Sequence, residues 1–353
     1  MVLPFLLLAS VLPHHASVAP YRQPQLAAGH GLVVLTFADD HSIYFASSRD
    51  QGRTFSQPSK VADVAALAAG RHRGPRAVIL KDAILISAVV GETVSTGPHA
   101  HGLPADGNLT VWRSVNQGKT WSKSGAINDA AGATREGLHA ITSDRNGNVL
   151  AAWLDKRAEG TQIYGSKSTD GGRTWSKNVS IYESPEGTVC ECCGPSIAAD
   201  DSGQVWVMWR NVLQGARDLY ITSSRDGARF EPARKIGVGT WSLNACPMDG
   251  GGVAVEGDHV VTAWRRDGSI FLAEPGKAET KVGSGKDVAI ARGKKGVYSA
   301  WSKGPGLEIL TPGASAPVPL ASEGAYVSLV GLPDGAVLAA WETGNSIDTK
   351  RVQ

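Results

Sequence analysis

The cysteines are the residues whose types and spacing point most directly to chemistry. The sequence holds four of them, gathered in two places. These two clusters are Cys190-Glu191-Cys192-Cys193-Gly194-Pro195 and Asn244-Ala245-Cys246-Pro247-Met248. Thiols at this density either pair as disulfides, which is the ordinary outcome in an exported chain, or bind a soft metal ion as thiolates.

Both outcomes are open from the sequence. If the four cysteines form two disulfides, a bridge between the clusters would link two neighbouring units of the chain. A metal site would use the thiolates of Cys190, Cys192, Cys193 and Cys246 with the thioether of Met248, a set that suits copper as Cu(I). Zinc would suit the set if a histidine joined it, and His99, His101 and His139 are the candidates. The spacing matches no common zinc-finger pattern.

A repeated turn indicates how the chain positions these groups. Its form is Ser-x-Asp-x-Gly-x-Thr-Trp, with some variation between copies. The copies are 48–55, 114–121, 168–175 and a shortened one at 224–230. An Asp or Asn at the turn start accepts backbone hydrogen bonds, Gly supplies positive φ, and the closing aromatic packs onto a neighbouring sheet. We therefore interpret the boxes as architectural.

A second repeat is a short apolar strand that ends in Trp. The copies are 148–153, 204–209, 259–264, 296–301 and 336–341. Each is preceded by another short strand, several are followed by a third, and no stretch has sustained helical periodicity. Matching strands at 32–37 and 83–89, nearer the N-terminus, bring the count to seven units. Seven such units predict an all-β fold, a β-propeller of four-stranded antiparallel blades that forms one domain over residues 20–353.

The boxes resemble the Asp boxes, or BNR repeats, of the sialidase superfamily of β-propellers. Enzymes of that superfamily are six-bladed, so the resemblance implies six blades where the count of units gives seven. We therefore expect six or seven blades. The boxes imply a fold and leave the reaction to be argued from the site.

Two short segments extend the resemblance to an active site. Tyr21-Arg22-Gln23-Pro24 is similar to the Arg-Ile-Pro motif that opens the sialidase propeller. This implies that Arg22 binds the substrate carboxylate, which a guanidinium can pair bidentately. The segment 325–331 resembles the Tyr-Ser-x-Leu segment, with Val327 inserted, and implies that Tyr326 is the covalent nucleophile. A phenol needs a carboxylate base in that role.

Two further roles follow from the same resemblance. Arg210, at the end of its strand, resembles the second arginine of the family. The acid/base aspartate is placed in the loop Asp39-Asp40-His41, where Asp40 is the better candidate. Two adjacent carboxylates can raise each other's pKa, which helps an acid, although they also occur in ordinary solvated turns.

The chain departs from the family pattern for two residues, the glutamate that activates the tyrosine and the third arginine. The glutamate that activates the tyrosine should fall near Gly194-Pro195, where Glu191 is the nearest carboxylate. The third arginine has no clean match, and the candidates are Arg265, Arg266 and Arg292. Arg73 and Arg76 also lie at the start of a strand, and they are candidates to line the mouth of the propeller's central channel.

The N-terminal segment and the net charge indicate where the protein is located and which kinds of partner it lacks. The run Val2–Leu12 is apolar but too short to span a bilayer, and small residues follow it up to Ala19. We therefore expect residues 1–19 to be a signal peptide and the protein to be secreted or periplasmic. A net charge of +2 without runs of like charge argues against nucleic acid or an anionic membrane as partner.

These features favour a secreted, sialidase-like exo-glycosidase. It would act as a monomer on the acidic terminal sugar of a glycan and would need no cofactor. One alternative is a non-hydrolytic exported propeller that binds copper or zinc through the cysteines. The other is a propeller that binds a carbohydrate or a protein at its mouth.

Overall fold

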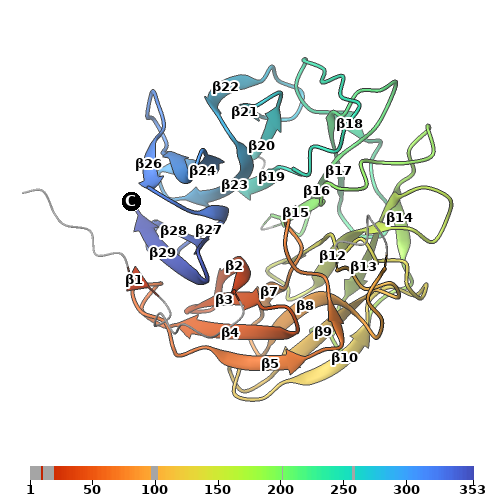
Figure 1. The fold of residues 1–353 in the computed structure, drawn as a ribbon, viewed down its shortest axis with the longest axis vertical. Coiled ribbons are helices and arrows are strands. Elements are labelled where there is room, and N and C mark those ends of the chain that lie inside the picture. Colours follow the sequence, from red (N-terminus) through yellow and green to blue (C-terminus); the bar gives the residue numbers. More distant parts are fainter. Residues whose placement is uncertain (1–8, 11–19, 97–101, 201, 257–258) are drawn as a thin grey trace, which may run out of the picture.

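The computed structural model describes residues 9–10, 20–96, 102–200, 202–256 and 259–353. In this part of the chain there are 29 β-strands and no α-helix. The strands form seven antiparallel sheets, or blades, around a central channel (Figure 1). The all-β propeller prediction is confirmed. The count of seven units was right, and the six blades implied by the resemblance were not.

The blades follow one another in chain order, and within each the strands run from the innermost outward. Blade one comprises β2 (Arg22–Gly29), β3 (Leu32–Ala38), β4 (Ser42–Ser48) and β5 (Ser59–Asp63). Blade two comprises β7 (Arg76–Ile79), β8 (Ile84–Gly91), β9 (Asn108–Ser114) and β10 (Ser122–Ala126), and β6 (Ala66–Leu67) also pairs with β8. Blade three comprises β11 (His139–Ser143), β12 (Val149–Asp155), β13 (Gln162–Ser168) and β14 (Val179–Tyr182).

The remaining blades follow the same plan. Blade four comprises β15 (Ser196–Ala199), β16 (Val205–Arg210), β17 (Leu219–Ser224) and β18 (Arg234–Lys235). Blade five comprises β19 (Gly252–Glu256), β20 (His259–Arg266), β21 (Ser269–Ala273) and β22 (Thr280–Ser284). Blade six comprises β23 (Lys286–Gly293), β24 (Gly296–Lys303), β25 (Gly306–Leu310) and β26 (Val318–Ala321).

Blade seven closes the ring against blade one. It contains β27 (Ala325–Gly331), β28 (Val337–Thr343) and β29 (Ser346–Val352), and β1 (Ala9–Ser10) pairs with the outer edge of β29. In Figure 1 the blue strands of this blade lie beside the red strand β2. The rest of the predicted signal peptide, residues 1–8 and 11–19, lies outside the described residues. Cleavage after residue 19 would leave blade seven with three strands. Among the described residues, no helix has the length and hydropathy to cross a membrane.

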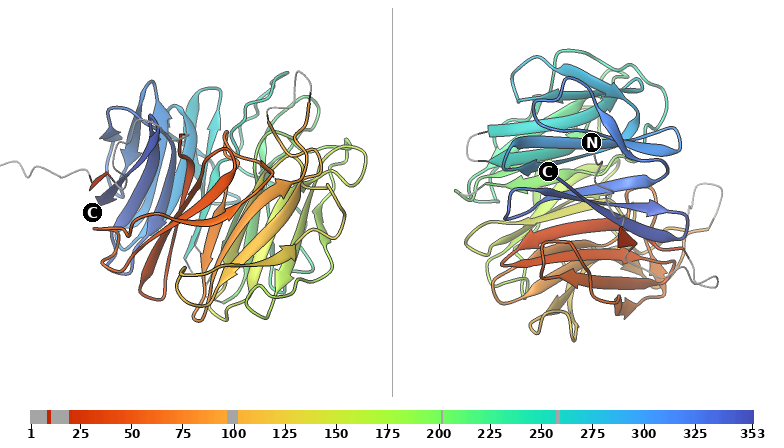
Figure 2. Two further views of the ribbon diagram at one scale, coloured as in Figure 1. Left: turned by 60° about the horizontal axis from the view of Figure 1, so that its bottom comes forward. Right: turned by 90° about the vertical axis from the view of Figure 1, so that its left-hand side faces the viewer.

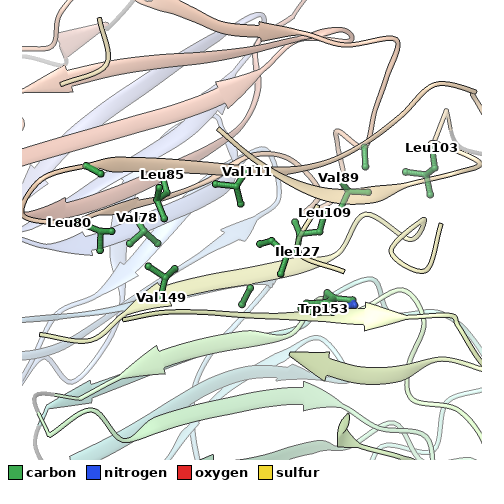
Figure 3. Packing of buried hydrophobic residues seen from close by; sticks show 13 residues of the cluster. Val78, Leu80, Leu85, Val89, Leu103, Leu109, Val111, Ile127, Val149 and Trp153 are labelled. Atoms are coloured by element: carbon green, nitrogen blue, oxygen red, sulfur yellow. The ribbon is translucent and has the colours of Figure 1, made fainter. Parts of the chain in front are cut away.

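The hydrophobic core lies between neighbouring blades. A sheet covered on both faces needs a continuous apolar run in its middle strands, and all seven residues of β12 are buried. Figure 3 shows one such layer, in which Leu85 and Val111 of blade two pack with Val149 and Trp153 of blade three. The strand-ending tryptophans are Trp153, Trp209, Trp264, Trp301 and Trp341, and all five are buried. The Trp repeat thus marks the second strand of blades three to seven.

The Asp box of blade three shows why its residues are needed. The amide and the hydroxyl of Thr174 donate to the Asp170 carboxylate at 2.9 and 2.6 Å, and the Gly172 amide donates to the Ser168 hydroxyl at 2.9 Å. Gly172 has a φ of +79°, and a Cβ there would lie 2.5 Å from a methyl carbon of Leu85. The left-handed turn and the close approach to blade two both require glycine.

We expect Asp170→Ala to lower the free energy of unfolding at neutral pH by about 1 kcal/mol, because it removes a charged hydrogen-bond acceptor from the turn. Burial alone would raise the pKa of Asp170, but hydrogen bonds from Thr174 and Ser168 outweigh it and lower the pKa to about 2. Since the folded pKa lies below the unfolded value of 3.8, this stabilisation is present above that value and is lost as the pH falls towards 2. Chemical denaturation at neutral and acidic pH measures both effects.

Asp170→Asn is the matched control for this variant. Asn116 occupies the same box position in blade two and accepts the Thr120 amide at 2.9 Å. The Asn variant should keep most of the stability at neutral pH and lose its acid dependence. An Ala variant as stable as the wild type at neutral pH would contradict the expectation.

Candidate functional site

One face of the ring gathers the chemically interesting residues. The innermost strands begin on this face and the second strands end on it, so that Arg22 pairs with Ala38 and Ala325 with Glu342. The side views in Figure 2 show the strands running between the two faces of the ring. Beneath this face the channel holds a polar cavity of about 270 Å³. We call the face with the starts of β2, β7, β11, β15, β19, β23 and β27 the mouth.

A repeated backbone feature brings three side chains to the mouth. Gln23, Asp287 and Tyr326 are each the second residue of an innermost strand, in blades one, six and seven. Each has a left-handed φ, of 55°, 58° and 52° respectively, and lies in a segment where the strand register shifts. Such bulges re-aim a side chain, and non-glycine residues in this conformation concentrate at functional sites.

Tyr326 lies among charged groups at the mouth. Its ring meets the His72 ring edge-on, with centroids 5.2 Å apart. Burial, followed by the charges of Asp287 and Glu342, raises the pKa of the Tyr326 phenol, while the charge of Arg71 opposes this. The phenol is therefore uncharged at neutral pH, with two carboxylates close enough to influence its proton.

Glu342 lies one residue before the end of the second strand of blade seven, and its charge acts on Tyr326. Its carboxylate accepts the main-chain amide of Gln23 at 2.6 Å and the side-chain amide of the same residue at 3.1 Å. Burial raises the pKa of Glu342 in spite of these two hydrogen bonds and the positive charge of Arg22. This carboxyl is thus a better proton acceptor than an ordinary exposed glutamate.

A chain of polar contacts leads inward from Tyr326. The Nε2 atom of His72 lies 2.8 Å from the carboxylate of Asp287. The amide of Asp287 donates to the buried Asp249 carboxylate at 2.9 Å, and the amide of Asp249 donates to the sulfur of Cys193 at 3.3 Å. The Tyr326 site and the cysteine cluster are therefore connected through blades five and six.

Two other predicted residues meet at the rim of the mouth. Arg22 and Asp40 lie 3.5 Å apart, with 39% and 55% of their side chains exposed. An exposed pair at this distance contributes little to stability. Arg22 also acts on Glu342, and Glu342 acts on Tyr326, so two predicted residues lie near one unpredicted carboxylate. Asp40 joins this group only through its pairing with Arg22.

Three of the predicted arginines donate hydrogen bonds to main-chain carbonyls of the protein itself. Arg210 is buried and donates to the carbonyls of Asp249, Arg217 and Arg265 at 3.0, 2.7 and 3.0 Å. Arg73 is buried and donates to the Glu136 carbonyl at 2.5 Å.

Arg76 donates to the carbonyls of His72, Gly74 and Pro75, and burial lowers its pKa to about 10. Arg265 stacks on Trp241, with its guanidinium carbon 5.4 Å from the ring centroid. By contrast, Arg71 is exposed, contacts the Met248 sulfur at 3.6 Å and acts on Tyr326.

Glu191, the predicted base, is not among the groups that act on Tyr326. Its carboxylate is 3.4 Å from the Lys156 ammonium and 3.4 Å from the Thr188 hydroxyl. The carboxylates whose charges act on Tyr326 are those of Asp287 and Glu342. The sequence did carry a signal for Glu342, since it follows the strand-ending Trp341 as Arg210 follows Trp209.

The cysteines form one bridge where we expected two. Cys192 and Cys246 are disulfide-bonded, with Cα atoms 6.3 Å apart, and link the loops before blades four and five. Cys190 and Cys193 are buried free thiols. A hydrogen bond with Cys193, followed by the charges of Arg217 and Arg210, lowers the pKa of the Cys190 thiol.

Two candidates for the metal alternative have different outcomes. Met248 packs against the cysteine cluster, as that alternative requires. His101 and His99, two of the three candidate imidazole ligands, lie outside the described residues.

Comparison with known proteins shows the fold. No family model matches the sequence, and no curated protein matches it. An α-L-arabinanase from Penicillium chrysogenum is 13% identical, with a TM-score of 0.58 over 99% of each chain. A Hadza microbial sialidase is 14% identical, with a TM-score of 0.52 over 92% of this chain and 74% of its own.

A protein of unknown function from Dyadobacter fermentans is 16% identical to this chain. Its TM-score is 0.56, over 99% of this chain and the whole of its own. The chain therefore has the propeller fold that sialidases and arabinan-degrading glycoside hydrolases share, at a sequence divergence that leaves the activity to its own site residues.

Proposed function

We propose that the protein is a retaining exo-glycosidase that removes a carboxylate-bearing terminal sugar from a glycan. The observation that carries this proposal is the environment of Tyr326, whose left-handed backbone holds the phenol at the mouth beside His72 and within reach of the charges of Asp287 and Glu342. The activities of two structural neighbours, an arabinanase and a sialidase, support the class of reaction.

The choice of nucleophile favours an acidic sugar. The raised pKa keeps Tyr326 uncharged until it reacts. An uncharged phenol approaches an anomeric carbon that bears a carboxylate without the repulsion that an aspartate or glutamate would meet. As the phenol oxygen bonds to the anomeric carbon, its proton must pass to a base.

In this proposal Glu342 is the base, because burial raises the pKa of its carboxyl. Its pKa is raised towards that of the phenol, which brings donor and acceptor closer in proton affinity. The two amide hydrogen bonds from Gln23 fix the orientation of the carboxylate. In the second half of the reaction Glu342 returns the proton to Tyr326 as water releases the sugar.

Arg22 and Asp40 take the remaining roles. A substrate carboxylate can displace Asp40 from Arg22, because their exposed ion pair is weak. Asp40 then protonates the glycosidic oxygen and later deprotonates the attacking water. Arg71 adds a second positive charge beside Tyr326.

The test is hydrolysis of a fluorogenic α-sialoside by the purified protein, beside a fluorogenic α-L-arabinofuranoside. We expect turnover of the sialoside and little of the neutral pentoside. Preference for the arabinofuranoside would overturn the acidic-sugar assignment, while absence of turnover on both would overturn the proposal.

Glu342→Gln is expected to lower kcat by roughly 10²- to 10⁴-fold, because the amide cannot accept the phenol proton. In the wild type, kcat/KM should rise with pH through the raised pKa of Glu342, above the usual value of 4.5, since the base must be ionised. The variant should lose this acid limb. Glu191→Gln is the comparison: activity lost there and kept in Glu342→Gln would return the role to Glu191.

A further inference from the structure

The free cysteines and one bridged cysteine converge on a single buried point. A tight turn, in which the Cys193 amide donates to the Cys190 carbonyl at 3.3 Å, brings three sulfur atoms together. The Cys190 sulfur lies 3.4 Å from that of Cys193 and 3.7 Å from that of Cys192, and the last two are 3.8 Å apart. All three side chains are buried.

This triangle has the dimensions of a metal–thiolate site. A point equidistant from the three sulfur atoms lies roughly 2.1 Å from each, close to the ~2.3 Å of a Zn–S bond. These three form the set whose ligand atoms all lie within 4.8 Å of one another, and Cys246 is outside it. Three converging thiolates favour a three-coordinate soft ion over a tetrahedral one.

The surroundings can stabilise negative charge on the sulfur atoms. The Arg217 guanidinium donates to the Cys190 sulfur at 3.1 Å, and the Asp249 amide donates to the Cys193 sulfur at 3.3 Å. Donors of this kind orient and tune thiolate ligands in metal sites. Arg210, tied to the Asp249 carbonyl, adds a second positive charge next to Cys190.

We propose that this cluster is a Cu(I) site, with Cys190, Cys192 and Cys193 as ligands, that is completed when the Cys192–Cys246 disulfide is reduced. A dithiol reductant supplies two electrons and two protons, the S–S bond breaks, and Cys192 and Cys246 become thiols while the dithiol is oxidised to its own disulfide. Binding of Cu(I) then displaces the protons of the three ligand thiols. The site is independent of the proposed glycosidase chemistry.

The experiment titrates Cu(I) alone into the anaerobic full-length protein, in competition with a chromophoric Cu(I) chelator. After reduction with a dithiol and its removal, the wild type should bind one Cu(I) per chain, and X-ray absorption should show three sulfur neighbours. The oxidised wild type should bind at least tenfold more weakly.

Cys246→Ser separates the ligands from the bridge. It leaves Cys192 as a free thiol, so this variant should bind one Cu(I) without any reductant. Cys190→Ser and Cys193→Ser should each lose at least tenfold in affinity after reduction, whereas Met248→Leu should keep the three-sulfur spectrum.

Several results would overturn the proposal. They are stoichiometric tight binding by the oxidised wild type, unchanged affinity in Cys193→Ser, or failure of both the reduced wild type and Cys246→Ser to bind. Zn(II) titrated alone is the rival probe. Tighter retention of zinc, with loss in Cys246→Ser, would assign a four-thiolate zinc site instead.

Discussion

Tyr326→Phe should abolish turnover of an α-sialoside, with kcat reduced by about a thousandfold or more. The change removes the attacking oxygen, and loss of a covalent nucleophile is among the most damaging changes that a glycosidase or protease can suffer. Phe keeps the edge-on contact with His72, so the fold should be retained. Steady-state kinetics with thermal denaturation as a check measure the effect.

A direct chemical readout accompanies this prediction. A fluorinated sugar that reacts slowly with the nucleophile should label the wild type at Tyr326, as peptide mapping by mass spectrometry would show, and should leave the Phe variant unlabelled. Undiminished turnover in Tyr326→Phe, or label on Asp287 or Glu342, would move the nucleophile to a carboxylate.

Arg210→Ala should lower the free energy of unfolding by about 3–5 kcal/mol. Its guanidinium is buried and donates to three main-chain carbonyls, those of Asp249, Arg217 and Arg265. Truncation leaves the buried carbonyl of Asp249 and two part-buried carbonyls without their donor. Urea denaturation measures the loss. If the Ala variant does not fold, Arg210→Lys can be measured instead, and it should show a smaller loss because it keeps the charge but not the planar guanidinium.

Arg22→Ala is the matched control, because it tests the arginine that is exposed at the rim. It should change stability by less than about 1 kcal/mol and should raise KM for an acidic sugar. If Arg210→Ala stays as stable as the wild type and loses substrate affinity instead, Arg210 would be the carboxylate ligand that the family resemblance implied.

The propeller could be predicted from the sequence because its signals are local. Each Asp box contains its own turn chemistry, as Asp170 and Thr174 show, and each buried second strand has its own apolar run ending in Trp. Repetition of these signals gave the number of units. Seven blades could therefore be predicted from the repeats, whereas the family resemblance alone suggested six.

Part of the site could be predicted for the same reason. Tyr326 and Arg22 were found from short motifs, and both lie near Glu342 in the structure. Asp40 was assigned from the position of its loop in the family, and it pairs with Arg22. Their roles remain predictions that the variants above test.

Only the tertiary structure determined which groups contact each site residue. Glu342 meets Gln23 across 319 residues, and His72 meets Asp287 across 215, because the closing of the ring brings the ends of the chain together. Arg210 and Arg22 look equivalent in sequence, yet one is fastened to three carbonyls and the other faces solvent. Local sequence determines turns and strands. The charge on a side chain is balanced by whichever groups the fold places beside it, and for Glu342 and His72 those groups come from other blades.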